Sequence, residues 1–184
     1  MSSRVDLRLI RLRAVWLLII PFYLYASPST GLIGWGAGVG ACGLALRVWA
    51  AGSIRKDREL ATSGPYAHTR NPLYLGSFLL GVGVTVAGGR WVFAVAFLAF
   101  FFVVYRATVL REAAVLEERF GERYRAYRAQ VPAVLPRITA YREAASDSPV
   151  GFSRARYFRN REWEALLGAI AAFAALALKL RFWP

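Results

Sequence analysis

The chain has few of the residues that metal sites and disulfides require. Its 184 residues include one cysteine, Cys42, and one histidine, His68. A single cysteine excludes an internal disulfide, and a zinc or iron site would need ligands drawn almost wholly from carboxylates, so we expect no metal. Acidic residues are also scarce, with 11 Asp and Glu against 24 Lys and Arg. The resulting net charge of +13 suits either nucleic acid or a membrane surface as a partner.

The distribution of the basic residues favours a membrane. They flank long apolar runs and form no continuous stripe with interleaved aromatic residues, which a nucleic-acid site would require. Hydrophobic residues make up 57% of the chain, above the share in an ordinary soluble protein. The N-terminus is basic and then apolar with no small-residue cleavage site after it, so we interpret it as a retained helix and not a signal peptide. We therefore expect an integral membrane protein that binds no nucleic acid.

Five apolar segments predict one all-α domain over residues 1–184, a polytopic membrane bundle of about five transmembrane helices. Helices of roughly 17–25 residues span a bilayer. The third segment is shorter, which indicates a tilted or partly inserted helix, and Pro21 predicts a kink in the first. The segments are approximately Leu9–Ala26, Leu32–Ala51, Leu73–Ala87, Trp91–Tyr105 with a continuation to Leu110, and Trp163–Phe182.

Arginine and lysine residues set the expected orientation. Four arginines lie before or within the first turns of the first helix, four basic residues lie in the 53–72 loop, and twelve arginines lie within 106–161. The loops at the other helix ends carry only Arg90, although Lys179 and Arg181 also fall on that side, against the rule. We therefore expect a cytoplasmic N-terminus and a cytoplasmic site. The Ala-, Gly- and Arg-rich composition is typical of a bacterial source, so the expected location is the bacterial inner membrane.

The segment between the second and third helices, GPYAHTRNPLYLG at residues 64–76, has more polar groups than a turn requires. Gly64-Pro65 and Asn71-Pro72 are turn signals, and tyrosines suit the membrane interface. That explanation does not account for Arg70 beside Asn71. Pro72 at a helix start also leaves free backbone N–H groups that can hold a carboxylate. The segment therefore predicts a binding site for a charged small molecule, with further candidates Tyr66, His68 and Tyr74.

A second candidate region lies where the fourth helix leaves the membrane. Residues 110–128 are charged with apolar members at helical spacing, which predicts an amphipathic extension, interrupted at Gly121 and ended by the prolines of VPAVLP. Glu112 is the first carboxylate after this helix and lies on nearly the same helical face as Tyr105. Glu112 is therefore the preferred candidate, whereas Glu117 and Glu118 fit a solvated helix face.

Two arginines near the cytoplasmic helix ends have alternative interpretations. For Arg47 we favour snorkelling of the side chain to the lipid headgroups. Arg106 follows the most apolar run of the chain and faces the polar segment in the expected topology, so it is a candidate site residue.

A GxGxxG pattern at Gly38, Gly40 and Gly43 lies inside an apolar helix. A dinucleotide site needs a strand before this pattern and a helix after it. Close helix packing through the Gly34/Gly38 and Gly36/Gly40 spacings is therefore favoured over nucleotide binding.

Together the two polar regions resemble the isoprenylcysteine carboxyl methyltransferase and phospholipid methyltransferase family of membrane enzymes. The first motif of this family is GPY followed by an Arg-His-Pro-x-Tyr-x-Gly box. Asn71 stands where the family usually has histidine, so it can form hydrogen bonds but cannot take up a proton. The matching residues are Gly64, Pro65, Tyr66, Arg70, Asn71, Pro72, Leu73, Tyr74, Leu75 and Gly76.

The second motif of the family is a Glu-Glu pair, a leucine and then Phe-Gly-x-x-Tyr-x-x-Tyr. Ala113 stands at the second acid of the pair, so only Glu112 carries over. The resemblance covers about residues 47–137, and the extra C-terminal helix at about 163–182 has no counterpart in it. The matching residues are Glu112, Leu116, Phe120, Gly121, Tyr124 and Tyr127.

The resemblance implies S-adenosylmethionine as the cofactor and a lipid or isoprenoid as the methyl acceptor. In this interpretation Arg70 and the backbone near Pro72 hold the methionyl carboxylate, and Glu112 holds the ammonium group. Glu112 and Arg106 are the catalytic candidates, with Arg106 orienting the acceptor. Tyr66 and Tyr74 pack on the cofactor. The remaining cofactor-binding candidates are Gly64, Pro65, His68, Asn71 and Leu75.

The identity of the acceptor is left open by the residues. A carboxylate needs no general base, whereas an amine or thiol must lose a proton. Because the chain has one histidine, O-methylation of a prenylcysteine-like carboxylate is favoured, and phospholipid N-methylation and thiol S-methylation are the alternatives. An NADPH-dependent membrane reductase is a remoter alternative. Membrane sterol reductases have a related Arg-x-Asn-Tyr-x-Gly box, but Leu73 before Tyr74 and Ser77 after Gly76 match that box poorly. A non-enzymatic membrane scaffold is another, and the sequence does not set the oligomeric state.

Overall fold

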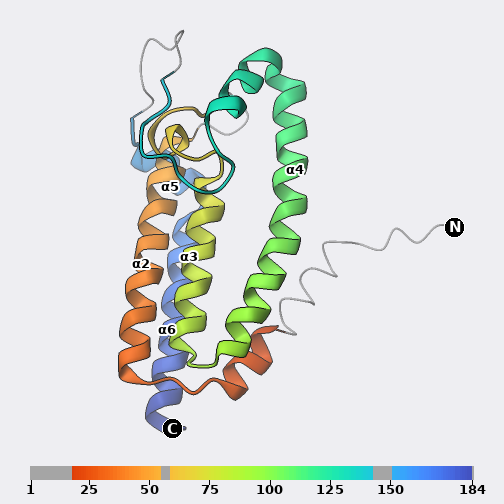
Figure 1. The fold of residues 1–184 in the computed structure, drawn as a ribbon. Coiled ribbons are helices and arrows are strands. Elements are labelled where there is room, and N and C mark those ends of the chain that lie inside the picture. The colour runs from red at the N-terminus through yellow and green to blue at the C-terminus, as the bar shows by residue number, and fades with distance from the viewer. Residues whose placement is uncertain (1–17, 55–58, 143–150, 184) are drawn as a thin grey trace, which may run out of the picture.

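The computed structural model describes residues 18–54, 59–142 and 151–183, and every regular element in these ranges is a helix (Figure 1). The predicted all-α architecture is therefore confirmed. Half of the first predicted helix, Leu9–Ala26, lies outside the described residues, and in the other half residues 18–25 are helical. The further elements are α2 (Thr30–Ser53), the 3-10 helix η1 (Gly64–Ala67), α3 (Pro72–Ala87), α4 (Trp91–Gln130), α5 (Arg154–Arg159) and α6 (Trp163–Phe182).

Three of the described helices, α2, α4 and α6, are long and apolar enough to cross a membrane. The other two predicted helices are the first, half of which lies outside the described residues, and the short α3, so the predicted number of about five stays a prediction. The helix α3 has 16 residues, which is short for a span, as its sequence predicts. Its first residue is Pro72. Proline is favoured at a helix start because a backbone N–H at that position would have no intrahelical partner, so proline loses no hydrogen bond there.

The fourth helix extends far beyond its apolar run and then bends. It continues to Gln130, directly before the VPAVLP segment, so the predicted stop is confirmed. Gly121 has φ 51° and ψ −124°, a conformation that side chains other than glycine rarely adopt. Figure 1 shows α4 leaning away from the other helices, with its last turns folding back over the end of the bundle where α3 begins. The predicted interruption at Gly121 therefore redirects the chain toward the polar segment.

The helices α2, α3 and α6 lie side by side, and α2 and α3 pack through glycines (Figure 1). A Cβ atom on Gly36 would lie 2.3 Å from the carbonyl oxygen of Gly83, and one on Gly43 would lie 2.6 Å from that of Gly76. The two backbones are therefore in direct contact. The packing predicted for Gly36 and Gly40 is confirmed.

The packing predicted for Gly34 and Gly38 is wrong. A Cβ atom on either residue would have no neighbour within 4 Å in the described part of the chain. The two contacting residues Gly36 and Gly43 are one heptad apart and share a helix face, whereas Gly34 and Gly38 lie on a different face of α2. A spacing rule identifies a pair of small residues but does not say which of several glycine pairs meets the neighbouring helix.

The segment before α6 is fixed to the C-terminal end of α2. The backbone N–H of Ser153 and the Nε of Arg156 donate to the carbonyl oxygen of Gly52, at 2.9 and 2.7 Å, and the Asn160 amide donates to that of Ala51 at 2.8 Å. These bonds satisfy carbonyls that lack partners at a helix end. The segment thus places the first residues of α6 beside the polar segment.

The other end of α6 explains why a lysine lies on the sparsely charged side. The Lys179 ammonium donates to the carbonyl oxygens of Tyr23 and Leu24, each at 2.6 Å. These carbonyls belong to the last turn of the helix over residues 18–25, where a cation is favourable. Figure 1 places residues 64–76 and the last turns of α4 at the opposite end of the bundle, in agreement with the predicted topology. Their cytoplasmic orientation stays a prediction.

We expect Gly36→Ala to destabilise the protein because the added methyl group collides with the backbone of α3. Overpacking of this kind costs roughly 1–3 kcal/mol. Gly38→Ala is the matched control, since a methyl group there would contact no described residue. Thermal unfolding in detergent should give a lower midpoint for Gly36→Ala and no loss for Gly38→Ala. Equal midpoints for the two variants would contradict the packing described above.

Candidate functional site

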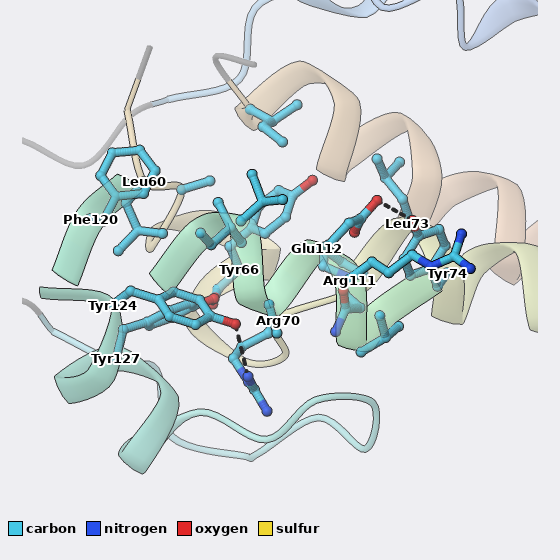
Figure 2. Close-up of a pocket in the computed structure, with 18 of the residues that line it drawn as sticks. Leu60, Tyr66, Arg70, Leu73, Tyr74, Arg111, Glu112, Phe120, Tyr124 and Tyr127 are labelled. Carbon is cyan, nitrogen blue, oxygen red and sulfur yellow. Dashed lines mark hydrogen bonds between the residues drawn. The ribbon is translucent and has the colours of Figure 1, made fainter. Parts of the chain in front are cut away.

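A cavity of about 620 Å³ lies between the start of α3 and the bent part of α4 (Figure 2). Its wall is formed by residues of α2, α3, α4, the 59–71 segment and the first turn before α6. It thus joins the two regions that the sequence singled out. The polar side chains in the wall are Arg47, Glu59, Tyr66, Arg70, Asn71, Tyr74, Ser77, Tyr105, Arg111, Glu112, Arg119, Tyr124, Tyr127 and Glu162.

Three hydrogen bonds connect the two motif regions directly. Arg70 donates from Nη1 to the Tyr124 hydroxyl at 3.1 Å, and the Tyr127 hydroxyl donates to the carbonyl oxygen of Tyr66 at 2.7 Å. The Tyr74 hydroxyl donates to Glu112. Figure 2 shows the Arg70–Tyr124 pair and the Glu112–Tyr74 pair on different sides of the cavity. Residues far apart in the sequence therefore form one polar site.

The chain after α4 turns back and covers the outer side of the motif loop. The backbone N–H of Arg70 donates to the carbonyl of Pro132, and the N–H of Arg137 donates to that of His68, each at 2.9 Å. The Asn71 amide donates to the carbonyl of Ala133 at 2.8 Å. Because these loop backbones bond to each other, the start of α3 is held in place from outside the cavity.

The predicted site residues fall into two groups. Those that line the cavity are Tyr66, Arg70, Asn71, Pro72, Tyr74 and Glu112. Those that do not are Gly64, Pro65, His68, Leu75 and Arg106.

The residues outside the cavity have other environments. Gly64 has φ 59°, which explains a glycine at the start of η1. The His68 ring nitrogen Nδ1 lies 2.9 Å from the carbonyl oxygen of Arg137, so this side chain contacts the loop after α4. Arg106 is exposed on α4, one residue after Tyr105, which does line the cavity. The acceptor-orienting role predicted for Arg106 is not supported by its position and stays a prediction.

The snorkelling interpretation of Arg47 is wrong. Its Nη2 donates to Glu162 at 2.6 Å, and its Nη1 donates to the hydroxyl of Ser77 and, at 3.4 Å, to the carbonyl of Leu73. The side chain is 20% exposed and points into the bundle. A guanidinium within an apolar helix requires compensating partners, and here the neighbouring helices supply them.

Glu162 was not among the predicted site residues. It follows a run of basic and aromatic residues that suits lipid headgroups, so nothing local distinguishes it. Its side chain is 9% exposed and its partner lies on α2. The one sequence feature that pointed to Glu162 was Arg47, which lies six residues before the end of α2. An arginine at that depth predicts a carboxylate nearby but does not identify it.

Three buried side-chain atoms in the described part of the chain have no hydrogen-bond partner, and all belong to residues that line the cavity. They are Arg47 Nε, the Tyr66 hydroxyl and Arg70 Nε. An unsatisfied buried polar atom is costly, and native proteins rarely leave one without a reason. All three can donate a hydrogen bond, so together they favour an anionic ligand.

The Tyr66 phenol is held in its neutral form. Burial raises its pKa well above the usual value, and the negative charges of Glu162 and Glu112 raise it further. The hydroxyl therefore remains a donor at any physiological pH and cannot serve as a base. No group of three or more His, Cys, Asp or Glu side chains among the described residues is placed to hold a metal ion.

Comparison with known proteins gives the following relatives. Residues 37–123 match the model of the phospholipid methyltransferase family. The protein-S-isoprenylcysteine O-methyltransferase of Schizosaccharomyces pombe is 33% identical over 88 residues, which cover 48% of this chain and 37% of that protein. The nickel-cobalt-cadmium resistance protein NccN of Alcaligenes xylosoxydans xylosoxydans is 32% identical over 102 residues, covering 54% and 47%.

A third relative is matched over more of its length. The cobalt-zinc-cadmium resistance protein CzcN of Cupriavidus metallidurans is 35% identical over 159 residues, which cover 77% of this chain and 72% of that protein. The chain thus spans less than half of the first two relatives and most of the third. No solved structure matches it significantly.

We expect Asn71→Ala to loosen the loop after α4, because the variant loses the bond from the amide to Ala133. A neutral hydrogen bond contributes about 1 kcal/mol. Hydrogen exchange of residues 132–141 should become faster in this variant. Ile138→Ala, which changes an exposed residue of the same loop, is the control. Unchanged exchange in Asn71→Ala would mean that Asn71 does not hold the loop.

Proposed function

Because the chain belongs to the phospholipid methyltransferase and isoprenylcysteine carboxyl methyltransferase family, we propose that it transfers a methyl group from S-adenosylmethionine to a lipophilic acceptor. The observation that carries this proposal is the set of three unpartnered buried donors in one cavity that also contains carboxylates. Such a mixture suits a zwitterionic amino-acid group together with a second anion. The favoured acceptor is a prenylcysteine-like carboxylate.

The residues present fit the cofactor. A cavity of about 620 Å³ is within the size range of small-molecule sites. Arg70 has an unpartnered Nε, and the Asn71 side chain does not cap α3. Pro72 has no N–H, and the backbone N–H groups of Tyr74 and Leu75 donate to the Asn71 carbonyl, so the N–H of Leu73 is the one in the first turn without a partner among the described residues and can bind a carboxylate. Glu112 would hold the ammonium group, and Tyr66 and Tyr74 would pack on the cofactor. When bound, the cofactor would supply a methyl group on a sulfonium, with a neutral thioether as the leaving group, and a carboxylate acceptor has no proton to lose.

The protein's own contribution is mainly positioning. Arg47 Nε and the Tyr66 hydroxyl are donors in the wall of the cavity, and we assign them to the acceptor carboxylate. Holding two reactants in line lowers the barrier because the entropy of bringing them together is spent on binding. No residue needs to remove a proton from a carboxylate acceptor, which agrees with the neutral phenol of Tyr66.

A second candidate function is N-methylation of a phospholipid amine. Residues 37–123 match a family named for phospholipid methyl transfer, and the carboxylate of Glu162 lies in the cavity wall. An ammonium group must lose a proton before it can attack, and a buried carboxylate is a candidate base. The three unpartnered donors favour the carboxylate acceptor over this alternative.

We expect Arg70→Ala and Glu112→Ala each to weaken binding of S-adenosylmethionine. Loss of a hydrogen bond to a charged group costs about 1.5–3 kcal/mol, which is roughly a 10- to 100-fold change in dissociation constant. Isothermal calorimetry on the detergent-solubilised protein measures the change. Arg125→Ala removes an exposed arginine of the same α4 helix and should bind as the wild type does. Wild-type affinity in both site variants would refute the cofactor assignment.

The chemistry of the product distinguishes the two acceptors. With methyl-labelled S-adenosylmethionine we expect label to be transferred to N-acetyl-S-farnesylcysteine. The product should be a methyl ester that mild base hydrolyses with release of labelled methanol. Vesicles of phosphatidylethanolamine serve as the competing acceptor, and an N-methylated lipid would retain its label in base. Transfer to the phospholipid alone would replace the carboxylate proposal by the second candidate.

A further inference from the structure

The turn before the C-terminal helix contributes a charged residue to the cavity. Glu162 immediately precedes α6 and lies outside residues 37–123, the region that matches the family. Its side chain is 9% exposed, and its Oε2 accepts from Arg47 Nη2 at 2.6 Å. Both residues line the cavity. The family match therefore does not include every charged group in the site.

The Arg47 guanidinium is held from two sides. One terminal nitrogen, Nη2, bonds to Glu162, and the other, Nη1, bonds to Ser77 and Leu73 at the start of α3. With both ends fixed, the orientation of the guanidinium plane is set, and Nε is the nitrogen that stays buried and without a partner. Arginine binds planar anions through a rigid fork of donors, so the orientation of that plane decides which donors a ligand meets.

The backbone before Glu162 is built to direct this side chain inward. Arg161 has φ 57°, the only positive φ at a non-glycine residue in the described part of the chain. Such strained conformations persist where the surroundings enforce them, and they concentrate at functional sites. Here the surroundings are the bonds from Ser153, Arg156 and Asn160 to the end of α2. Anchoring and turn together place a carboxylate opposite Arg47.

We infer that Glu162 is a positioning residue that orients Arg47 toward the methyl acceptor, so that α6 forms part of the acceptor end of the site. This inference rests on the proposed function. It assigns the C-terminal helix a role in binding the acceptor's anionic group and none in binding the cofactor, for which Arg70 and Glu112 are proposed.

The test is a comparison of kinetic constants with N-acetyl-S-farnesylcysteine as the acceptor. Glu162→Ala should raise the KM for this acceptor by about tenfold or more, with a smaller change in kcat. The dissociation constant of S-adenosylmethionine should stay within about twofold of wild type, since the cofactor residues are untouched. Glu162→Gln keeps an oxygen that accepts from Nη2 and should restore most of the wild-type KM. Glu122→Ala removes an exposed carboxylate of α4 and is the control.

The possible failures are distinct. A wild-type protein that neither binds S-adenosylmethionine nor methylates the acceptor refutes the proposed function. A wild-type protein that methylates the acceptor, with an unchanged KM in Glu162→Ala, overturns the role of Glu162. An equal loss of acceptor and cofactor binding in Glu162→Ala also overturns it, because that pattern indicates a general disturbance of the fold.

A second variant covers the case in which Glu162→Ala does not fold. Arg47→Lys keeps a positive charge that can pair with Glu162 but lacks the Nε donor. We expect a thermal midpoint close to wild type together with a raised KM for the acceptor and unchanged affinity for S-adenosylmethionine. An unchanged acceptor KM in this variant would also overturn the inference.

Discussion

The direct contact between the backbones of α2 and α3 determines where the charged groups of this protein can lie. At Gly43 and Gly76 the two helices approach so closely that a Cβ atom on either residue would collide with the carbonyl of the other. One turn along α2, the side chain of Arg47 runs over Gly76, and a Cβ there would lie 2.6 Å from Arg47 Cγ. A larger residue at position 76 would therefore displace the guanidinium from the start of α3. The glycine of the motif box thus has a packing reason, which is to admit the stem of an arginine.

The placement of Arg47 requires a compensating negative charge, which another part of the chain supplies. A charge inside an apolar bundle is strongly unfavourable unless it is paired and hydrogen-bonded. The partner comes from the far end of the sequence, because the segment over residues 151–160 is fixed to the last carbonyls of α2. Removing one member of a buried pair leaves the other charge uncompensated, so α2, α3 and α6 are linked in stability as well as in position.

The sequence predicted the features that depend on neighbouring residues. The ends of α3 and α6, the interruption at Gly121 and the stop before VPAVLP all follow from local propensity and turn chemistry. It also identified the two motif regions, whose meeting is seen in the Arg70–Tyr124 and Tyr74–Glu112 contacts.

What the sequence could not provide are contacts that depend on how helices pack. The Arg47–Glu162 pair joins residues 115 positions apart. The exposed position of Arg106 depends on the rotation of α4 about its own axis, which an all-round apolar run does not specify. The spacing rule for glycines also does not specify the rotation of α2 about its axis. It therefore predicted close packing correctly for Gly36 and Gly40 and wrongly for Gly34 and Gly38. Ala113, at the position of the family's second acid, lines the cavity and supplies no charge there. The buried carboxylate of the cavity is instead Glu162, at the start of a helix that the motifs do not include, so substitutions in the turn before α6 have to be considered when the acceptor is sought.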